Sequence, residues 1–225
     1  AKYARAIVQR GITYRVMKRY EDALNDFNQA IELDDRYDWI VILRGITYRV
    51  MERYEDALSD FNQAIQLDSE SSFIVAERGF TYLFFDHYED AVRDFEKAIQ
   101  LDSKDDWYLY LRALGYLKLN ESEKSLSSLN QAISIAAQEY EVKSDSYLNM
   151  FNLALYHLVS RNIQDAVKYY EKAVNICENT YDVETAITDL EDFSKLFPEH
   201  QGVTVVLQLL KSKLNELKDK SFNGL

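Results

Sequence analysis

The side chains best suited to catalysis or metal binding are few in this chain and far apart. The three histidines, His87, His157 and His200, lack the ligand spacing of motifs such as H-x-x-x-H. The single cysteine, Cys177, has no neighbouring His or Asp pattern that would activate a thiolate, and it cannot form an intramolecular disulfide. No glycine-rich phosphate-binding loop is present. We therefore expect a protein that is not an enzyme, with no catalytic residue, no metal site and no cofactor.

Two charged patterns recur at regular intervals, and each has a functional and a structural interpretation. The first pattern is a pair of adjacent acidic residues, which occurs as Glu21-Asp22, Glu55-Asp56 and Glu89-Asp90. The second is a single arginine, which occurs as Arg10, Arg44, Arg78 and Arg112. Carboxylate pairs are suited to acid–base chemistry, and an arginine row is suited to an anionic track. Structural roles recur in every unit of a repeat protein, whereas ligand-binding roles seldom do. We therefore interpret the acidic pairs as a solvated face, and we expect the stem of each arginine to pack while its guanidinium pairs with an Asp or Glu that the repeats carry.

These intervals define an internal repeat. Arg-Gly-Ile-Thr-Tyr begins at positions 10 and 44, Arg-Gly-Phe-Thr-Tyr begins at 78, and a weaker copy begins at 112, so the period is 34. Residues 10–34 and 44–68 are identical at 22 of 25 positions. A fifth copy, with Ala154, Ala166, Tyr170 and Ala173, follows the fourth at an offset of 41. About seven extra residues are therefore expected near positions 140–145.

The period and the pattern Gly-x-x-Tyr…Ala-x-x-x-Phe resemble the tetratricopeptide repeat. The resemblance implies an all-α fold, a right-handed α-solenoid of helix-turn-helix repeats with a C-terminal helical cap. The expected repeats cover about residues 4–37, 38–71, 72–105, 106–139 and 147–180, and the cap covers 181–225. Glycines such as Gly11 and Gly45 suit the close approach of two helices within a repeat. In the cap, two amphipathic helices are expected on either side of Pro198.

Composition limits the classes of partner. The formal net charge is −12, which disfavours nucleic acid and anionic membrane surfaces, because both require a basic patch. No apolar run reaches the roughly 18–20 residues that span a bilayer. We therefore expect a protein or peptide partner, no nucleic acid and no membrane, and a cytoplasmic location.

The resemblance also implies a binding surface, because in this family the first helix of each repeat lines a concave groove. We expect groove residues at the second, fifth, ninth, twelfth and thirteenth positions of these helices. The predicted groove residues are Trp39, Ile42, Ile46, Arg49, Phe73, Phe80, Phe84, Trp107, Tyr110, Leu114 and Phe151. Family members that grip acidic chaperone tails place basic and amide side chains where this chain has Val8, Ile12, Leu43 and Phe73. Recognition of a C-terminal carboxylate is therefore not expected.

Three interpretations of this apolar surface remain open. The residues form core between repeats, or they hold an apolar or amphipathic helix of a partner, or they are covered by the chain's own flanking segments or a second copy. The leading functional hypothesis is a non-catalytic scaffold that binds an apolar or amphipathic polypeptide segment. One alternative is a regulatory or sensor array of a larger protein, suggested by the near-identical tandem copies and by Ala1 as first residue. Another is a solenoid that self-associates as a homo-oligomer.

Overall fold

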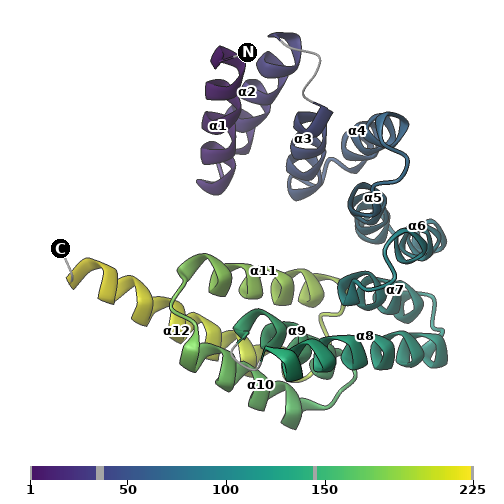
Figure 1. Cartoon of the computed structure of the whole chain (residues 1–225), viewed down its shortest axis with the longest axis vertical. Coiled ribbons are helices and arrows are strands. Elements are labelled where there is room, and N and C mark those ends of the chain that lie inside the picture. The colour runs from purple at the N-terminus through teal and green to yellow at the C-terminus, as the bar shows by residue number, and fades with distance from the viewer. Residues whose placement is uncertain (1, 34–37, 144–145, 224–225) are drawn as a thin grey trace. The chain divides into compact units, whose positions relative to one another are not determined.

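The described part of the chain is entirely helical. The computed structural model describes residues 2–33, 38–143 and 146–223, which form twelve helices and contain no strand (Figure 1). The helices are α1 (Lys2–Val16), α2 (Tyr20–Leu33), α3 (Asp38–Val50), α4 (Tyr54–Leu67), α5 (Ser72–Phe84), α6 (Tyr88–Leu101), α7 (Asp106–Lys118), α8 (Ser122–Val142), α9 (Tyr147–Val159), α10 (Ile163–Ile176), α11 (Thr180–Leu196) and α12 (Val203–Asn223). The predicted all-α, helical-repeat fold is confirmed.

The same turn closes the first helix of every repeat. The second residue after each of these helices has a left-handed backbone, with φ between 58° and 63°. These residues are Lys18, Glu52, Asp86, Asn120 and Arg161, so the first four keep the repeat period and the last keeps the longer offset of the fifth repeat. The next amide donates to the carbonyl five residues earlier, as in Arg53 N to Tyr48 O at 2.9 Å. This arrangement satisfies carbonyls at the helix end and reverses the chain into the second helix.

The chain divides into two compact units, Ala1–Ser122 and Glu123–Leu225, which we call unit 1 and unit 2. Unit 1 contains α1 to α7, and the first helices α3, α5 and α7 line the inner side of its arc, with α4 and α6 outside (Figure 1). This grouping differs from the predicted division into repeats and cap. The predicted repeat boundaries remain a sequence-based assignment.

Within unit 1, each helix pair is held by a glycine against a phenylalanine ring. A Cβ on Gly45 would lie 3.1 Å from the Phe61 ring, and one on Gly79 would lie 2.9 Å from the Phe95 ring. Both rings are fully buried. The absence of a side chain at the glycine therefore lets the second helix place its ring directly on the first.

The extra residues before the fifth repeat lengthen the second helix of the fourth. The helix α8 has 21 residues, whereas α2, α4, α6 and α10 each have 14. The sequence prediction of about seven inserted residues is confirmed in number, and the insertion adds two turns to α8. The helix α9 then meets the far end of α8, where Asn149 Nδ2 lies 3.4 Å from Glu139 Oε2.

Unit 2 has a continuous apolar core. Tyr156, Tyr170, Leu190 and Phe193 are almost completely buried, and α12 packs against α10 and α11. Exposed ion pairs such as Lys211–Glu191, at 3.0 Å, join α12 to α11 on the outside. The expected helix pair around Pro198 is present as α11 and α12.

Candidate protein-binding groove

Two large aromatic side chains are exposed on the inner helices of unit 1. Trp39 on α3 is 40% exposed and Phe73 on α5 is 48% exposed, and the two occupy the same position of successive repeats. Trp107 on α7 occupies the third equivalent position, but it is half-buried and lies 4.7 Å from the Tyr110 ring. The apolar surface is therefore open along α3 and α5 and closes toward α7.

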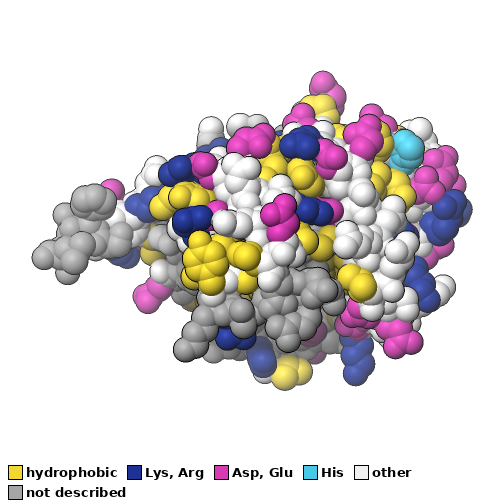
Figure 2. Space-filling model, turned by 90° about the horizontal axis from the view of Figure 1, so that it is seen from above, with side chains coloured by type: hydrophobic (Ala, Val, Ile, Leu, Met, Phe, Trp, Pro, Cys, Tyr) yellow, Lys and Arg dark blue, Asp and Glu magenta, His cyan; other side chains and the backbone are white. Residues whose placement is uncertain are grey.

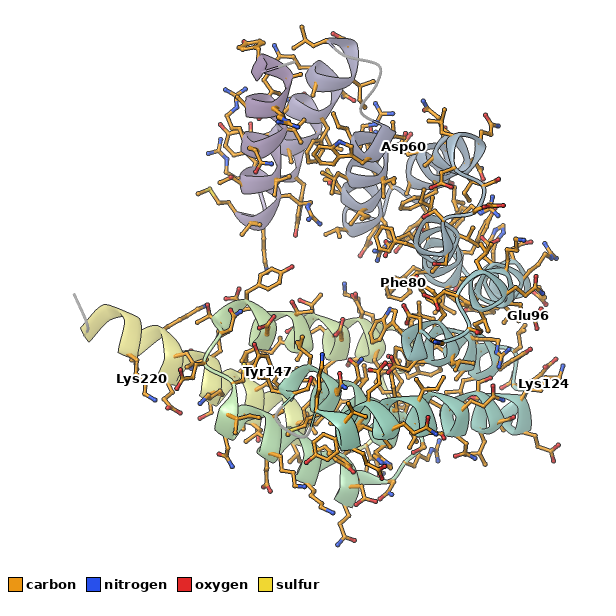
Figure 3. The ribbon with its side chains drawn as sticks, viewed as in Figure 1. Asp60, Phe80, Glu96, Lys124, Tyr147 and Lys220 are labelled. Carbon is orange, nitrogen blue, oxygen red and sulfur yellow. The ribbon has the colours of Figure 1, made fainter. Side chains whose placement is uncertain are left out.

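A charged pair lies in the middle of this surface. Arg49 on α3 donates to Glu77 on α5 at 2.9 Å, and both side chains are largely buried. The Arg49 guanidinium also lies 4.6 Å above the Phe80 ring, which packs edge-on against Phe84 at 5.1 Å. In Figure 3, Phe80 lies on the side of α5 away from α6. The structure therefore brings Arg49, Phe80 and Phe84 together, and the cation–π contact fixes the arginine over apolar surface.

Glu77 was not among the predicted groove residues. The signal for it was weak, because the equivalent positions in the first two repeats are Gln9 and Leu43. One repeat earlier, Arg15 occupies the position of Arg49, and Leu43 stands where Glu77 would be. Among the described residues the Nε atoms of both Arg15 and Arg49 are buried and have no hydrogen-bond partner. The two equivalent arginines differ at the residue they face on the following inner helix, because only Arg49 has a glutamate there, to which its Nη2 donates.

Three predicted groove residues lie in the core and not on a surface. Tyr110 is 2% exposed, Leu114 is 1% exposed and Phe151 is 6% exposed. Phe151 packs near the rings of Tyr147 and Tyr170 within unit 2. For these residues the helical phase read from the sequence does not predict accessibility, and the interpretation as core applies.

Two further predicted residues, Ile42 and Ile46, are half-buried. They pack against a cluster formed by Ala57, Phe61, Ala64 and Ile74. Along α3 they lie between Trp39 and Arg49, and only part of each side chain is accessible.

The arginine row is confirmed as structural in the first three repeats. Arg44 donates through Nε and Nη2 to both Asp60 oxygens at 2.8 and 2.6 Å, and Arg78 holds Asp94 in the same way. Asp60, labelled in Figure 3, lies where α3 and α4 meet. Burial raises the pKa of Asp60, and the hydrogen bonds from Arg44 oppose that rise. These guanidinium groups are already occupied, which removes the alternative of an anionic track.

The row also links one repeat to the next. Arg44 Nη1 donates to Asn28 Oδ1 at 2.8 Å, and Arg78 Nη1 donates to Asn62 Oδ1 at 2.7 Å. Each arginine therefore joins the second helix of its own repeat to the second helix of the repeat before. The bidentate geometry suits arginine in particular.

His87, His157 and the cysteine pack as ordinary side chains. His157 stacks on Tyr169 with centroids 5.6 Å apart, His87 stacks on Phe85 at 4.9 Å, and Cys177 is fully buried. Burial raises the pKa of the Cys177 thiol. Over residues 2–33, 38–143 and 146–223, no group of three His, Cys, Asp or Glu side chains is placed to hold a metal ion. The same residues include no helix that is both long and apolar enough to span a membrane.

The face shown in Figure 2 carries acidic and basic side chains interspersed with separate hydrophobic patches. Scattered apolar side chains are normal on soluble proteins, so the aromatic pair on α3 and α5 is the more informative feature.

Comparisons with known proteins give one consistent result. Residues 4–37, 76–105 and 151–185 match models of the tetratricopeptide repeat. A thermophilic TPR protein from Thermus thermophilus is 17% identical over 81% of this chain and 95% of that chain, with a TM-score of 0.62. MamA from Desulfovibrio magneticus RS-1 is 14% identical over 60% of this chain and 76% of that chain, with a TM-score of 0.57. No curated protein sequence is a significant match. Identities this low show the fold alone.

Proposed function

Because this chain belongs to the tetratricopeptide repeat family, we propose that it is a protein-interaction scaffold that binds another polypeptide along α3 and α5 of unit 1. The favoured ligand is an apolar or amphipathic segment. The observation that carries the proposal is the exposure of Trp39 and Phe73 at equivalent positions of neighbouring inner helices.

The chemistry of this surface suits an amphipathic helix. Aromatic side chains of this size supply most of the binding energy at protein interfaces when a partner covers them. The Arg49–Glu77 pair, further along the same two helices, offers one polar point, which would orient the partner without leaving a charge unpaired. An apolar helix face laid across α3 and α5 would bury both rings at once.

The test is a double substitution, Trp39→Ala with Phe73→Ala. We expect the affinity for a partner captured by the unmodified chain to fall by about 2 kcal/mol or more, or roughly thirtyfold, measured by isothermal titration. Leu67→Ala is the matched control, because Leu67 is 55% exposed but lies on the outer helix α4. Equal affinity of the double variant and the control would contradict the groove assignment.

A further inference from the structure

A small hollow in unit 2 lies where the turn between α9 and α10 meets the loop between α11 and α12. It has a volume of about 270 Å³ and is lined by Arg161, Ile163, Glu199, His200 and Gln201. Arg161 lies in the turn, Ile163 begins α10, and the other three residues lie in the loop. The volume is below the roughly 300–1,000 Å³ of pockets for drug-sized ligands, so the hollow suits a smaller molecule.

The loop is held against the turn by a close contact at Gly202. This glycine has a left-handed backbone, with φ of 98°, and a Cβ on it would lie 2.8 Å from Ile163 Cδ1 and 3.2 Å from Leu158 Cδ1. Within the loop, the His200 amide donates to the Phe197 carbonyl at 3.1 Å. Packing therefore fixes the walls of the hollow, because any side chain at Gly202 would push the loop away from α9 and α10.

The ring nitrogens of His200 are buried without hydrogen bonds. The imidazole packs edge-on against the Phe193 ring, with centroids 5.0 Å apart. The carbonyls of Leu158 and Gln201 lie near the ring, but neither completes a hydrogen bond, so both nitrogens lack a partner among the described residues. Burial, with a smaller contribution from Arg161, lowers the pKa of His200, so the imidazole is neutral at pH 7. It therefore has one N–H donor and one acceptor nitrogen that are unused.

Two charged side chains of opposite sign also line the hollow. Arg161 and Glu199 are both exposed, and neither forms an ion pair with any other described residue. Other exposed charges of unit 2 do pair, as Lys218 does with Glu184 at 2.9 Å. Two opposite charges that share a hollow without pairing can each bind the opposite charge of a single zwitterion.

We propose that this hollow binds a small, free, aliphatic α-amino acid. Arg161 and the N–H of His200 would hold its carboxylate, Glu199 would hold its ammonium group, and Ile163 would contact its side chain. Both nitrogens of His200 are covered in this structure, so binding requires the imidazole to turn. A half-turn about the Cβ–Cγ bond exchanges each nitrogen with a ring carbon. The carboxylate then supplies the acceptor that the buried N–H lacks.

A zwitterion suits this hollow better than a molecule with one charge. A simple anion would pair with Arg161 but lie near the like charge of Glu199, and a simple cation would meet the reverse arrangement. The half-buried Ile163 offers an aliphatic contact, which suits a short aliphatic side chain on the ligand. The hollow lies in unit 2 and does not depend on the groove along α3 and α5, so either proposal can fail alone.

The experiment follows the imidazole of His200 by NMR in the full chain, with the histidines labelled with ¹³C and ¹⁵N. The chain has three histidines, so the variants His87→Gln and His157→Gln assign the His200 signal. The probes are L-valine, isovalerate, which lacks the ammonium group of valine, and isobutylamine, which lacks its carboxylate. We expect L-valine to shift the His200 signal saturably, and each analogue with one charge to bind at least tenfold more weakly.

Substitutions that remove one charge test each half of the site. Arg161→Gln and Glu199→Gln should each weaken the binding of L-valine at least tenfold. The preference for L-valine over isobutylamine should narrow in Arg161→Gln, and its preference over isovalerate should narrow in Glu199→Gln. Lys172→Gln and Glu171→Gln are the matched controls, because they remove the same charges from exposed positions of α10 that do not line the hollow. All four sites are exposed, so unchanged thermal unfolding confirms folded variants.

Several results would overturn the proposal. It fails if L-valine leaves the His200 signal unchanged, or if isovalerate or isobutylamine binds as tightly as L-valine. It also fails if either Arg161→Gln or Glu199→Gln keeps the full affinity for L-valine. Equal losses of affinity in the site variants and in the two α10 controls would assign the binding to the overall charge of the chain and not to this hollow.

Discussion

The two units of this chain are stabilised in different ways. In unit 1, the buried aspartates Asp26, Asp60 and Asp94 are each held by an arginine, and Arg44 and Arg78 also reach the preceding repeat, so these polar contacts recur with the repeat period. In unit 2 the buried side chains are almost all aliphatic or aromatic, and among the described residues no arginine holds the desolvated carboxyl of Asp189 in this way. The position that holds Asp26, Asp60 and Asp94 in the first repeats becomes Ser128 in the fourth. The Arg–Asp pair therefore recurs only in repeats that keep both the arginine and the aspartate.

The largest expected effect comes from breaking the Arg44–Asp60 pair of the second repeat. Asp60→Ala leaves the Arg44 guanidinium, which is 20% exposed, without its carboxylate. We expect the free energy of unfolding of unit 1 to fall by about 3 kcal/mol, because an uncompensated, partly buried charge remains. Urea-induced unfolding followed by circular dichroism measures this loss.

The Arg10–Asp26 pair of the first repeat provides the comparison for this prediction. Asp26→Ala removes the same carboxylate from Arg10, whose side chain is 56% exposed and can be solvated instead. Its cost should be clearly smaller than that of Asp60→Ala. Equal losses of stability for the two variants would show that burial of the arginine does not determine how much an Arg–Asp pair stabilises unit 1.

The second prediction concerns the desolvated carboxyl of unit 2. Burial, with a smaller contribution from Asp192, raises the pKa of Asp189 to about 7. An unfolded aspartate titrates near pH 4, so between about pH 4 and 7 the folded state holds one more proton than the unfolded state. The free energy of unfolding therefore decreases as the pH rises through this range, and then levels off.

Asp189→Asn should remove this slope and stabilise unit 2 at pH 8. We expect a gain of more than about 1 kcal/mol, since each unit of pKa shift corresponds to about 1.4 kcal/mol. Thermal unfolding across the pH range is the measurement. Asp192→Asn is the control and should keep most of the slope, because burial is the larger cause of the shift. A slope that persists in Asp189→Asn would assign it to another group.

The sequence predicted the features that repeat and missed those that do not. The period, the close approach of helices at the glycines and the pairing of Arg44 and Arg78 with repeat-borne acidic residues follow from recurrence, and the structure contains all of them. The groove prediction lost accuracy in α7 and α9, whose sequences are apolar on every side. When a helix is hydrophobic on every side, its sequence does not indicate which side faces the solvent. Tyr110, Leu114 and Phe151 were therefore assigned to a surface although they are buried.

The insertion before the fifth repeat is a second feature that the sequence predicts only in part. Its number of residues was readable from the offset of 41, but an insertion can form a loop or continue a helix. The run Ala136-Ala137-Gln138-Glu139 contains no glycine or proline, which was the available signal for a longer helix. Whether a neighbouring hairpin covers the new helical surface depends on packing, which the period does not encode.

The smallest predicted effect tests the one device that both units share, the left-handed turn residue. Glu52 in unit 1 and Arg161 in unit 2 have φ values of 61° and 63°, which place a Cβ against its own backbone. Glycine relieves this strain but loses more entropy on folding, so Glu52→Gly and Arg161→Gly should each stabilise their unit by about 0.5–1 kcal/mol, as measured by urea-induced unfolding. Asn120→Gly should change little, because asparagine tolerates this conformation. If the gain appears in unit 1 and not in unit 2, then the turn carries strain only within the regular repeats, and the difference between the two units extends to their backbones as well as their cores.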